Sequence, residues 1–357
     1  MPPRHTLRLT SDAPFRSLVG VGGVGSGVLF ALEGDHDLGR NESRLAQLQD
    51  ARDYCKLHIV AHYPALLLGA RASGAPFHVV PIARVGDDEN GRRLKLEMEA
   101  VGMDCRFVES VADRPTLQSV CFQYPDGTGG NITTADSAAA ALTDSDIDRA
   151  LELIGRTTIA LALPEVPLSA RGHLLRIAKG RDAFRVAAFA TAEVAEARRL
   201  GLFALSDLVA LNGDEAEALT DRRLDPGDPH SVLDACVAAL DAERLGKRVL
   251  LTAGAHGAFG FDGERWKHSP APPVPVASTA GAGDALLGGV LTALAAGAPF
   301  ASALDLGVLL AAYKVTSRHT IHPDAGLDAL LGFAAQSGVA FDTALTRLLQ
   351  ARNTHVA

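Results

Sequence analysis

The stretch "VASTAGAGDALLGG", residues 276–289, combines a glycine-rich turn with the start of an apolar helix. Gly281, Ala282 and Gly283 leave the backbone uncovered, and Asp284 follows at once. Beyond Asp284, apolar residues recur with helical spacing, which predicts a buried helix that begins at the turn. Free N–H groups at such a helix start, together with the helix dipole, form an anion site. A carboxylate beside an anion site is electrostatically unfavourable, so the position of Asp284 indicates a functional role.

The composition of the whole chain is that of a globular protein. The 357 residues are 47% hydrophobic and carry a formal net charge of -8, with no block of Lys and Arg. This balance argues against nucleic acid or an anionic membrane as a partner. The four cysteines lack the spacing of a zinc site or a disulfide framework, and the N-terminus lacks the apolar core of a signal peptide. We therefore expect a cytoplasmic protein without a transmembrane helix.

Apolar runs and helical patterns alternate along most of the chain. This alternation predicts an α/β fold with a doubly wound, mainly parallel sheet flanked by helices. We expect a single domain over residues 17–345, preceded by a polar leader over residues 1–16. Segments at about 31–45 and 115–133 break the alternation and are predicted to form a small β lid over the ligand edge of the sheet.

A second glycine-rich loop, Gly20 to Gly25, matches the G-x-G-x-x-G pattern of dinucleotide-binding proteins. A Rossmann unit needs a helix directly after these glycines, whereas here a polar, turn-rich segment follows. An NAD-dependent oxidoreductase is therefore a rival hypothesis that the sequence disfavours. We expect instead that the glycines let the end of a strand pass close to a ligand.

Four segments of the chain resemble the ribokinase-like (PfkB) carbohydrate kinases. The segment "TAGAGD", residues 279–284, closely resembles the T-x-G-A-G-D signature of that family, and three further segments resemble its other motifs in the same order. These are "ARVGDDENGRRLKLEMEAVGMD" at 83–104, "LNGDEAEAL" at 211–219 and "LLTAGAHGAFGF" at 250–261. The resemblance implies a ribokinase-like fold, ATP and Mg²⁺ as cofactors, and phosphorylation of a hydroxyl group.

The chemistry of phosphoryl transfer assigns roles to the residues of the glycine loop. Asp284 is the predicted general base for the acceptor hydroxyl. The N–H groups of residues 280–283, which include Gly281, Ala282 and Gly283, are predicted to receive the phosphoryl oxygens. The structural alternative is that Asp284 only caps a helix.

Further residues are predicted to bind the nucleotide and its metal. Asn212 and Glu215 follow an apolar strand and could hold Mg²⁺ through water, with Glu215 as the metal ligand. The same pair could instead form a capping box at the start of a helix. The resemblance further implies that Thr252, Gly254, Gly257 and Thr279 line the nucleotide.

The chain departs from the family pattern in two places. Ser278 replaces an acid that often helps hold a monovalent cation, so potassium dependence stays open. The sugar-binding G-G-x-x-x-N segment is absent, and "ARDYCKLHIVAHY" stands in its place. Candidate acceptor-site residues are Gly22, Arg40, Asn41, Lys56 and His58, each of which could instead belong to a solvated lid surface or to packing.

The sequence thus predicts an ATP-dependent kinase that acts on a sugar or sugar-like small molecule. A nucleoside kinase on the same fold and a non-catalytic sugar-binding sensor remain as alternatives. Exposed lid strands could also pair between two subunits to give a homodimer.

Overall fold

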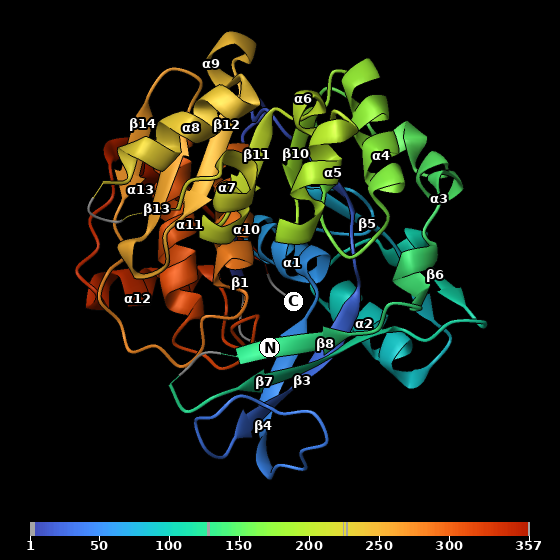
Figure 1. Ribbon diagram of the computed structural model, residues 1–357. Helices are drawn as coiled ribbons and strands as arrows, with labels where there is room; N and C mark the ends of the chain where they lie inside the picture. The colour runs from blue at the N-terminus through green and yellow to red at the C-terminus, as the bar shows by residue number, and fades with distance from the viewer. Residues whose placement is uncertain (1–3, 127–128, 224, 226–227, 356–357) are drawn as a thin grey trace.

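The computed structural model describes residues 4–126, 129–223, 225 and 228–355 and is organised around one large sheet (Figure 1). Seven neighbouring strands are parallel, and the last two at one edge are antiparallel. The order across the sheet is β14 (Trp266–Ser269), β13 (Ala258–Phe261), β12 (Arg248–Thr252), β11 (Leu208–Leu211), β10 (Phe184–Ala188), β9 (Thr158–Ala162), β2 (Ser17–Val21), β5 (His78–Gly86) and β6 (Val108–Val111). The predicted doubly wound, mainly parallel sheet is confirmed.

Helices cover both faces of this sheet and bury two separate apolar layers. One face is covered by α1 (Lys56–Leu68), α2 (Glu89–Ala100), α10 (Ala282–Ala295), α11 (Phe300–Lys314), α12 (Leu327–Gln336) and α13 (Thr343–Gln350). The other is covered by α3 (Asp144–Asp148), α4 (Leu168–Gly180), α5 (Val194–Arg199), α6 (Leu202–Leu205), α7 (Gly213–Thr220), α8 (His230–Leu240) and α9 (Ala242–Leu245). Among the residues with described structure, no helix is long and apolar enough to cross a membrane.

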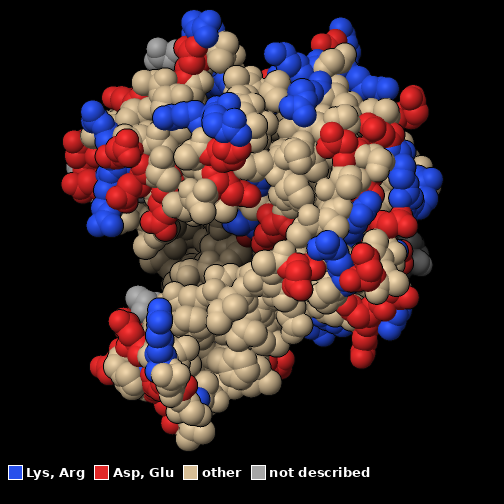
Figure 2. Space-filling model, turned by 45° about the vertical axis from the view of Figure 1, so that its right-hand side comes forward, with Lys and Arg blue, Asp and Glu red and all other residues tan. Residues whose placement is uncertain are grey.

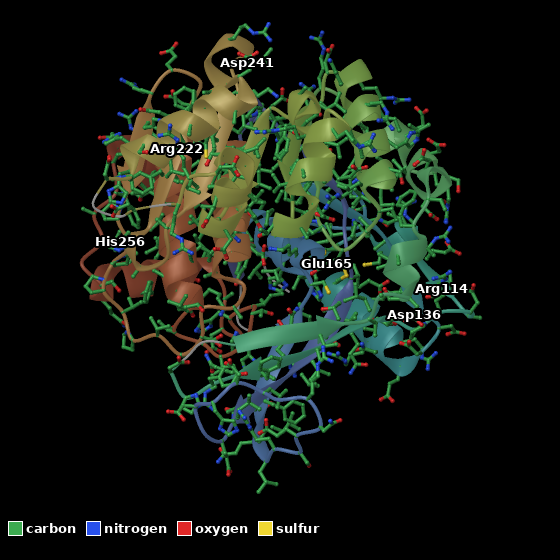
Figure 3. The ribbon with its side chains drawn as sticks, in the orientation of Figure 1. Arg114, Asp136, Glu165, Arg222, Asp241 and His256 are labelled. Carbon is green, nitrogen blue, oxygen red and sulfur yellow. The ribbon has the colours of Figure 1, made fainter. Side chains whose placement is uncertain are left out.

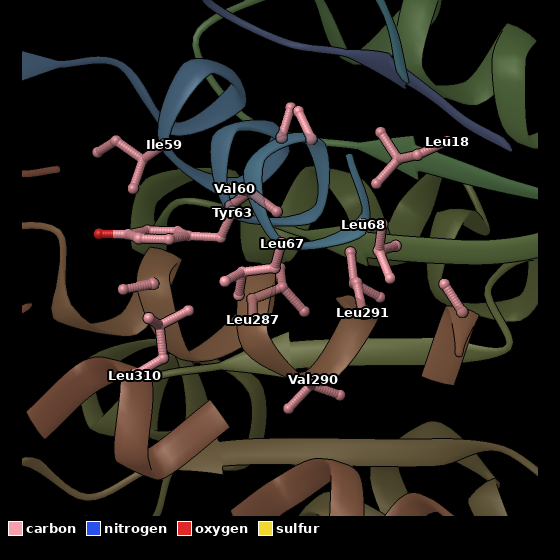
Figure 4. Close-up of a cluster of buried hydrophobic side chains, with 14 of the residues drawn as sticks. Leu18, Ile59, Val60, Tyr63, Leu67, Leu68, Leu287, Val290, Leu291 and Leu310 are labelled. Atoms are coloured by element: carbon pink, nitrogen blue, oxygen red, sulfur yellow. The ribbon is translucent and has the colours of Figure 1, made fainter. Parts of the chain in front are cut away.

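The helix predicted after Asp284 is α10, which is buried between α1 and α11 (Figure 4). Leu287 and Leu291 of α10 pack in the same cluster as Val60 and Tyr63 of α1. A Cβ atom at Gly288 would lie 3.0 Å from the carbonyl oxygen of Val60, so the two helices approach closely there. This contact holds the N-termini of α1 and α10 side by side.

A separate four-stranded sheet forms the lid below the main sheet (Figure 1). Its strands, in spatial order, are β4 (Ala46–Tyr54), β3 (Gly25–Leu32), β7 (Leu117–Gln123) and β8 (Gly129–Thr133). The predicted segment 115–133 coincides with the hairpin of β7 and β8. The predicted segment 31–45 contains mainly the loop between β3 and β4. The two lid strands themselves lie before and after this segment.

The glycines at positions 20–25 lead from β2 into the lid strand β3. A strand and not a helix comes directly after them, so the Rossmann alternative is wrong. Within the segment predicted as a polar leader, residues 4–7 form β1 (Arg4–Leu7), which pairs with β15 (Arg352–His355), and Leu7 is buried. The ordered fold therefore includes residues outside the range 17–345.

Candidate active site

The carboxyl ends of β2, β9, β11 and β12 meet at the sheet edge that faces the lid, where parallel α/β sheets bind ligands. Figure 2 shows a hollow between the lid and the main body of the protein. The loop Ser278–Gly283, which we call the anion loop, reaches this edge directly before Asp284.

The anion loop turns into α10 at Gly281. This residue has φ 75°, and a Cβ atom there would lie 2.8 Å from the carbonyl oxygen of Thr320. The Ala280 N–H donates to the Ser278 Oγ atom at 3.3 Å, and the Ala282 N–H donates to the Thr279 carbonyl at 3.1 Å. Within the described part of the chain, the N–H groups of Gly281, Gly283 and Asp284 have no acceptor. The free donors are therefore these three, whereas the donors at Ala280 and Ala282, included in our expectation, are already engaged within the turn.

Lys56 and Asp284 are brought together by the adjacent helix starts of α1 and α10. The Lys56 Nζ atom lies 3.6 Å from Asp284 Oδ1, and the Asp284 side chain is 17% exposed. The Asp284 charge is the largest influence on Lys56 and raises the pKa of its ammonium group. Two helix N-termini and a lysine therefore place positive potential around one carboxylate.

Glu165 is a site residue that the sequence analysis missed. It follows β9 by three residues, and its Oε2 atom accepts a hydrogen bond of 3.3 Å from the Lys56 backbone N–H. Figure 3 labels it at the junction of the main sheet and the lid. Burial raises the pKa of Glu165 to about 7 despite the opposing attraction of Lys56. The available signal was an acid placed just after the carboxyl end of a buried strand.

Asp53 is a second missed acid, and it comes from the lid strand β4. The Cys121 thiol donates to its Oδ2 atom at 3.4 Å, and a Cβ atom at Gly27 would lie 2.2 Å from the same oxygen. Burial raises the pKa of the Asp53 carboxyl, and the nearby Asp284 charge raises it further. Asp53 therefore faces the site from the lid, a position that only the pairing of β3 with β4 and β7 creates.

A cavity of about 700 Å³ adjoins the anion loop. Five of the six residues predicted to bind the nucleotide line it, namely Asn212, Thr252, Gly254, Gly257 and Thr279. Ala282 and Gly283 of the anion loop also line it, and Val274, Val276 and Val315 give it apolar walls. A cavity that combines part of the anion loop with apolar walls suits a nucleoside triphosphate, which has an anionic and a less polar part.

Asn212 and Glu215 form a capping box at the start of α7. The Glu215 N–H donates to Asn212 Oδ1 at 2.8 Å, and the Asn212 N–H donates to Glu215 Oε2 at 2.9 Å. Burial raises the pKa of the Glu215 carboxyl, and the Lys56 charge opposes that rise. The capping box that we considered as the structural alternative is thus formed. It uses Glu215 Oε2 and does not involve Glu215 Oε1.

Of the predicted acceptor-site residues, the structure brings only Lys56 to Asp284. Arg40 and Asn41 lie in the exposed loop between β3 and β4 at the far end of the lid (Figure 1). Gly22 is buried, and a Cβ atom there would lie 2.9 Å from the Leu57 Cβ atom, so packing against α1 accounts for this glycine.

His58 belongs to a different cavity. Its ring is 1% exposed and lies 4.4 Å from the Tyr54 ring, on a face of α1 other than that of Lys56. It lines a space of about 440 Å³ together with residues of α2 and the segment 319–325. The local reason is helical geometry, because residues two positions apart on a helix do not share a face.

An anion loop beside a carboxylate and a large cavity suits a small-molecule kinase, and comparison with known proteins gives the family of the chain. The model of the pfkB family carbohydrate kinases matches residues 67–325. The chain belongs to this family and is a phosphotransferase with an alcohol group as acceptor. The resemblance seen in its motifs is thereby confirmed.

Relatives with described activities lie in the same family. The chain is 26% identical to the ribokinase of Haemophilus influenzae over 237 residues, which cover 66% of this chain and 75% of that protein. It is also 26% identical to the deoxyribokinase of Salmonella typhimurium over 245 residues, covering 68% and 77% of the two proteins.

Solved structures share the fold at lower sequence identity. Ribokinase from Thermotoga maritima superposes with a TM-score of 0.70 at 21% identity, covering 90% of this chain and 100% of that one. A nucleoside kinase from Burkholderia thailandensis in complex with inosine gives a TM-score of 0.69 at 17% identity, covering 90% and 98%. These likenesses establish the ribokinase-like fold.

Proposed function

We propose that this protein transfers the γ-phosphoryl group of ATP to a hydroxyl group of a sugar or sugar-like small molecule, with Asp284 as the general base. One observation carries the proposal. The free N–H groups at the start of α10 lie beside the Asp284 carboxylate and its Lys56 partner, and Gly283 of the same helix start lines a cavity of about 700 Å³.

The reaction requires little covalent chemistry of the protein. Asp284 accepts the proton of the acceptor hydroxyl while the hydroxyl oxygen forms a bond to the γ-phosphorus of ATP. The bond between the γ-phosphorus and the β–γ bridging oxygen breaks at the same time and releases ADP. The N–H groups of Gly281, Gly283 and Asp284 stabilise the negative charge of the transferring group. Lys56 adds positive charge beside the Asp284 carboxylate.

The residues at the nucleotide cavity also suit a magnesium ion. Glu215 uses Oε2 in the capping box, and Oε1 is left to hold the hydration shell of an ion bound mainly by ATP. Mg²⁺ would supply charge neutralisation on the phosphates. Water-mediated contact with Glu215 fits an ion that gives up its water reluctantly.

The charge of the acceptor side favours a neutral substrate. Asp53, Glu165 and Asp284 interact electrostatically there, and Lys56 is already paired with Asp284. Carboxylates accept hydrogen bonds from hydroxyl groups and repel phosphates. A neutral sugar, polyol or nucleoside is therefore favoured over an acceptor that already carries a phosphate or carboxylate.

The test is ADP release with Mg²⁺ and ATP across a panel of sugars, polyols, phosphosugars and nucleosides. Asp284→Asn should lower kcat by roughly 100-fold or more with ATP affinity retained, because only the proton acceptor is lost. Asp182→Asn is the matched control, since Asp182 is exposed and pairs with Arg156 at the surface.

The outcomes separate the alternatives. Turnover on nucleosides alone would establish the nucleoside kinase. Ligand binding without turnover on any acceptor would favour the sugar sensor. Acceptor-dependent turnover that survives Asp284→Asn would show that Asp284 is not the base.

A further inference from the structure

Lys314, the last residue of α11, is a fully buried lysine with no part in the reaction described above. Its Nζ atom donates to the carbonyl oxygen of Ser278 at 3.0 Å, and none of the ion pairs found among the described residues includes it. Burying an ammonium group with only a carbonyl partner is unfavourable unless nearby charge compensates it. The position of Lys314 therefore needs a reason beyond packing.

The Lys314 ammonium is bonded to the first residue of the anion loop. Backbone hydrogen bonds join the same two segments in the other direction. The N–H groups of Ala277 and Ser278 donate to the Val315 carbonyl oxygen at 2.7 and 3.3 Å. The end of α11 and the start of the anion loop are thus bonded to each other. A change in the charge or position of Lys314 acts directly on the loop that precedes Gly281.

The charges that Lys314 experiences belong to the active site. Burial lowers the pKa of Lys314 to about 8, and the carboxylates of Asp53 and Asp284 oppose this shift. Asp53 belongs to lid strand β4, and Asp284 to the first turn of α10. The lysine therefore compensates the two acids that face the acceptor, and it would also attract the phosphates that enter the loop.

A neutral hydroxyl or amide could make the same hydrogen bond to Ser278 without the cost of a buried charge. What only the lysine supplies is a covalently held positive charge at the backbone carbonyl of Ser278. A small monovalent cation taken from solution could provide the same charge at that oxygen. Covalent attachment to α11 removes the need for such an ion.

We propose that Lys314 is a built-in cation that positions the anion loop and makes phosphoryl transfer independent of added monovalent cations. The inference rests on the proposed kinase activity. Lys314 is a positioning residue, since it contacts the loop and not the reacting atoms.

The experiment compares the wild type with Lys314→Ala and Lys314→Met in potassium, ammonium, sodium and choline chloride at constant ionic strength. The wild type should have the same kcat in all four salts within about twofold. In choline chloride, Lys314→Ala should lose kcat by roughly 10- to 100-fold, which is less than the loss on removing a direct donor to the oxyanion, because Lys314 contacts the loop and not the reacting atoms. Potassium or ammonium should restore most of that loss by entering the vacated space.

Lys314→Met separates charge from packing, because its side chain fills the space with an apolar thioether. It should lose activity like Lys314→Ala and gain little from any salt. Circular dichroism and thermal unfolding of both variants establish that they fold. If Lys314→Ala does not fold, the salt independence of the wild type and the activity of Lys314→Met decide the matter.

Lys247 provides the matched control. It is also a buried lysine, its ammonium donates to the Phe203 carbonyl, and burial lowers its pKa to about 8. It precedes β12 and so lies at the opposite edge of the sheet from the site. Lys247→Ala should lower the unfolding temperature and leave kcat and its salt dependence unchanged.

The inference is overturned if the wild type requires potassium, if Lys314→Ala keeps full activity, or if no cation restores a folded Lys314→Ala. It is also overturned if Lys247→Ala shows the same loss and the same rescue. These results differ from failure of the proposed function, which is the absence of acceptor-dependent ADP release by the wild type in every salt.

Discussion

Lys56 balances the charge of the candidate site at the scale of single residues. Its ammonium lies 3.6 Å from Asp284, and its charge also lowers the pKa values of Glu165 and Glu215 against the effect of burial. Three carboxyl groups, on α7, on α10 and in the loop after β9, thus share one lysine. An arrangement of this kind perturbs protonation, which is typical of sites that move protons.

Glu165 leads to a prediction about stability and pH. Because folding raises the pKa of Glu165 from 4.5 to about 7, the folded state favours the protonated form. Its contribution to stability is therefore present below about pH 4.5 and is lost as the pH rises toward 7. The free energy of unfolding of Glu165→Gln should therefore be roughly 1–3 kcal/mol higher than that of the wild type at about pH 8. The two values should differ little near pH 4.5.

Urea unfolding at several pH values measures this difference. Glu196→Gln is the control, because Glu196 is exposed and its Arg199 partner lowers the pKa of its carboxyl. The stability of Glu196→Gln relative to the wild type should not increase with rising pH. A Glu165→Gln curve that runs parallel to the wild-type curve from about pH 5 to about pH 8 would contradict a raised pKa at Glu165.

The sequence could identify those site residues whose positions follow from local backbone structure. Asp284 and the anion loop belong to one turn and one helix start, and Thr252 to Gly257 belong to one strand end and turn. Asp53 is different, because it reaches the site through pairing between strands that lie far apart in the chain. Such a position depends on the lid topology and has no local pattern.

The capping box of helix α7 stabilises the start of the helix, and we propose that its Glu215 also helps to bind Mg²⁺. Glu215→Gln keeps an oxygen that can accept from the Asn212 N–H, so the cap survives while the charge is lost. The Mg²⁺ concentration for half-maximal activity should rise roughly 10-fold or more, with little change in the unfolding temperature.

The effects of capping and of charge can be separated with changes at Asn212. Asn212→Ala removes the cap and should cost about 1 kcal/mol of stability, whereas Asn212→Ser should retain it. Magnesium titrations and thermal unfolding of all three variants give both quantities. Superimposable Mg²⁺ titrations for the wild type and Glu215→Gln would limit Glu215 to its structural role.

The elements themselves were predictable to different degrees. The central strands are buried on both faces, so β5 and β9 are nearly continuous apolar runs that stand out in the sequence. The lid strand β4, "AQLQDARDY", has one face toward the site and is largely polar. Its register with β3 depends on pairing and includes a bulge, so no local pattern in this polar sequence indicates a strand.

The lid also determines what the whole molecule presents to other chains. Its register places Asp53 and Cys121 on the face toward the active site, and places Val120 opposite Ile132 on the other face. That outer face is apolar and includes Val28, Phe30, Leu32, Leu48, Val120, Phe122 and Ile132. The lid surface visible in Figure 2 carries few charged side chains apart from its tip.

We propose that this apolar lid face is the contact of a homodimer, in place of the strand-edge pairing that the sequence suggested. Leu48 is 65% exposed and Ile132 is 69% exposed, which is unfavourable for neighbouring apolar side chains on a monomer. Leu48→Glu combined with Ile132→Glu should convert a dimer into monomers, because two buried carboxylates without partners oppose association.

Sedimentation velocity over a range of protein concentrations measures the assembly state. Leu96→Glu is the matched control, since Leu96 is also 65% exposed but lies on α2, outside the lid sheet. It should leave the dimer intact.

Because β3 and β7 link the outer face to the strand that carries Asp53, loss of the dimer should also raise the KM for the acceptor while the KM for ATP stays constant. A wild type that sediments as a monomer at all concentrations, or a double variant that remains dimeric, would rule out the lid as the contact.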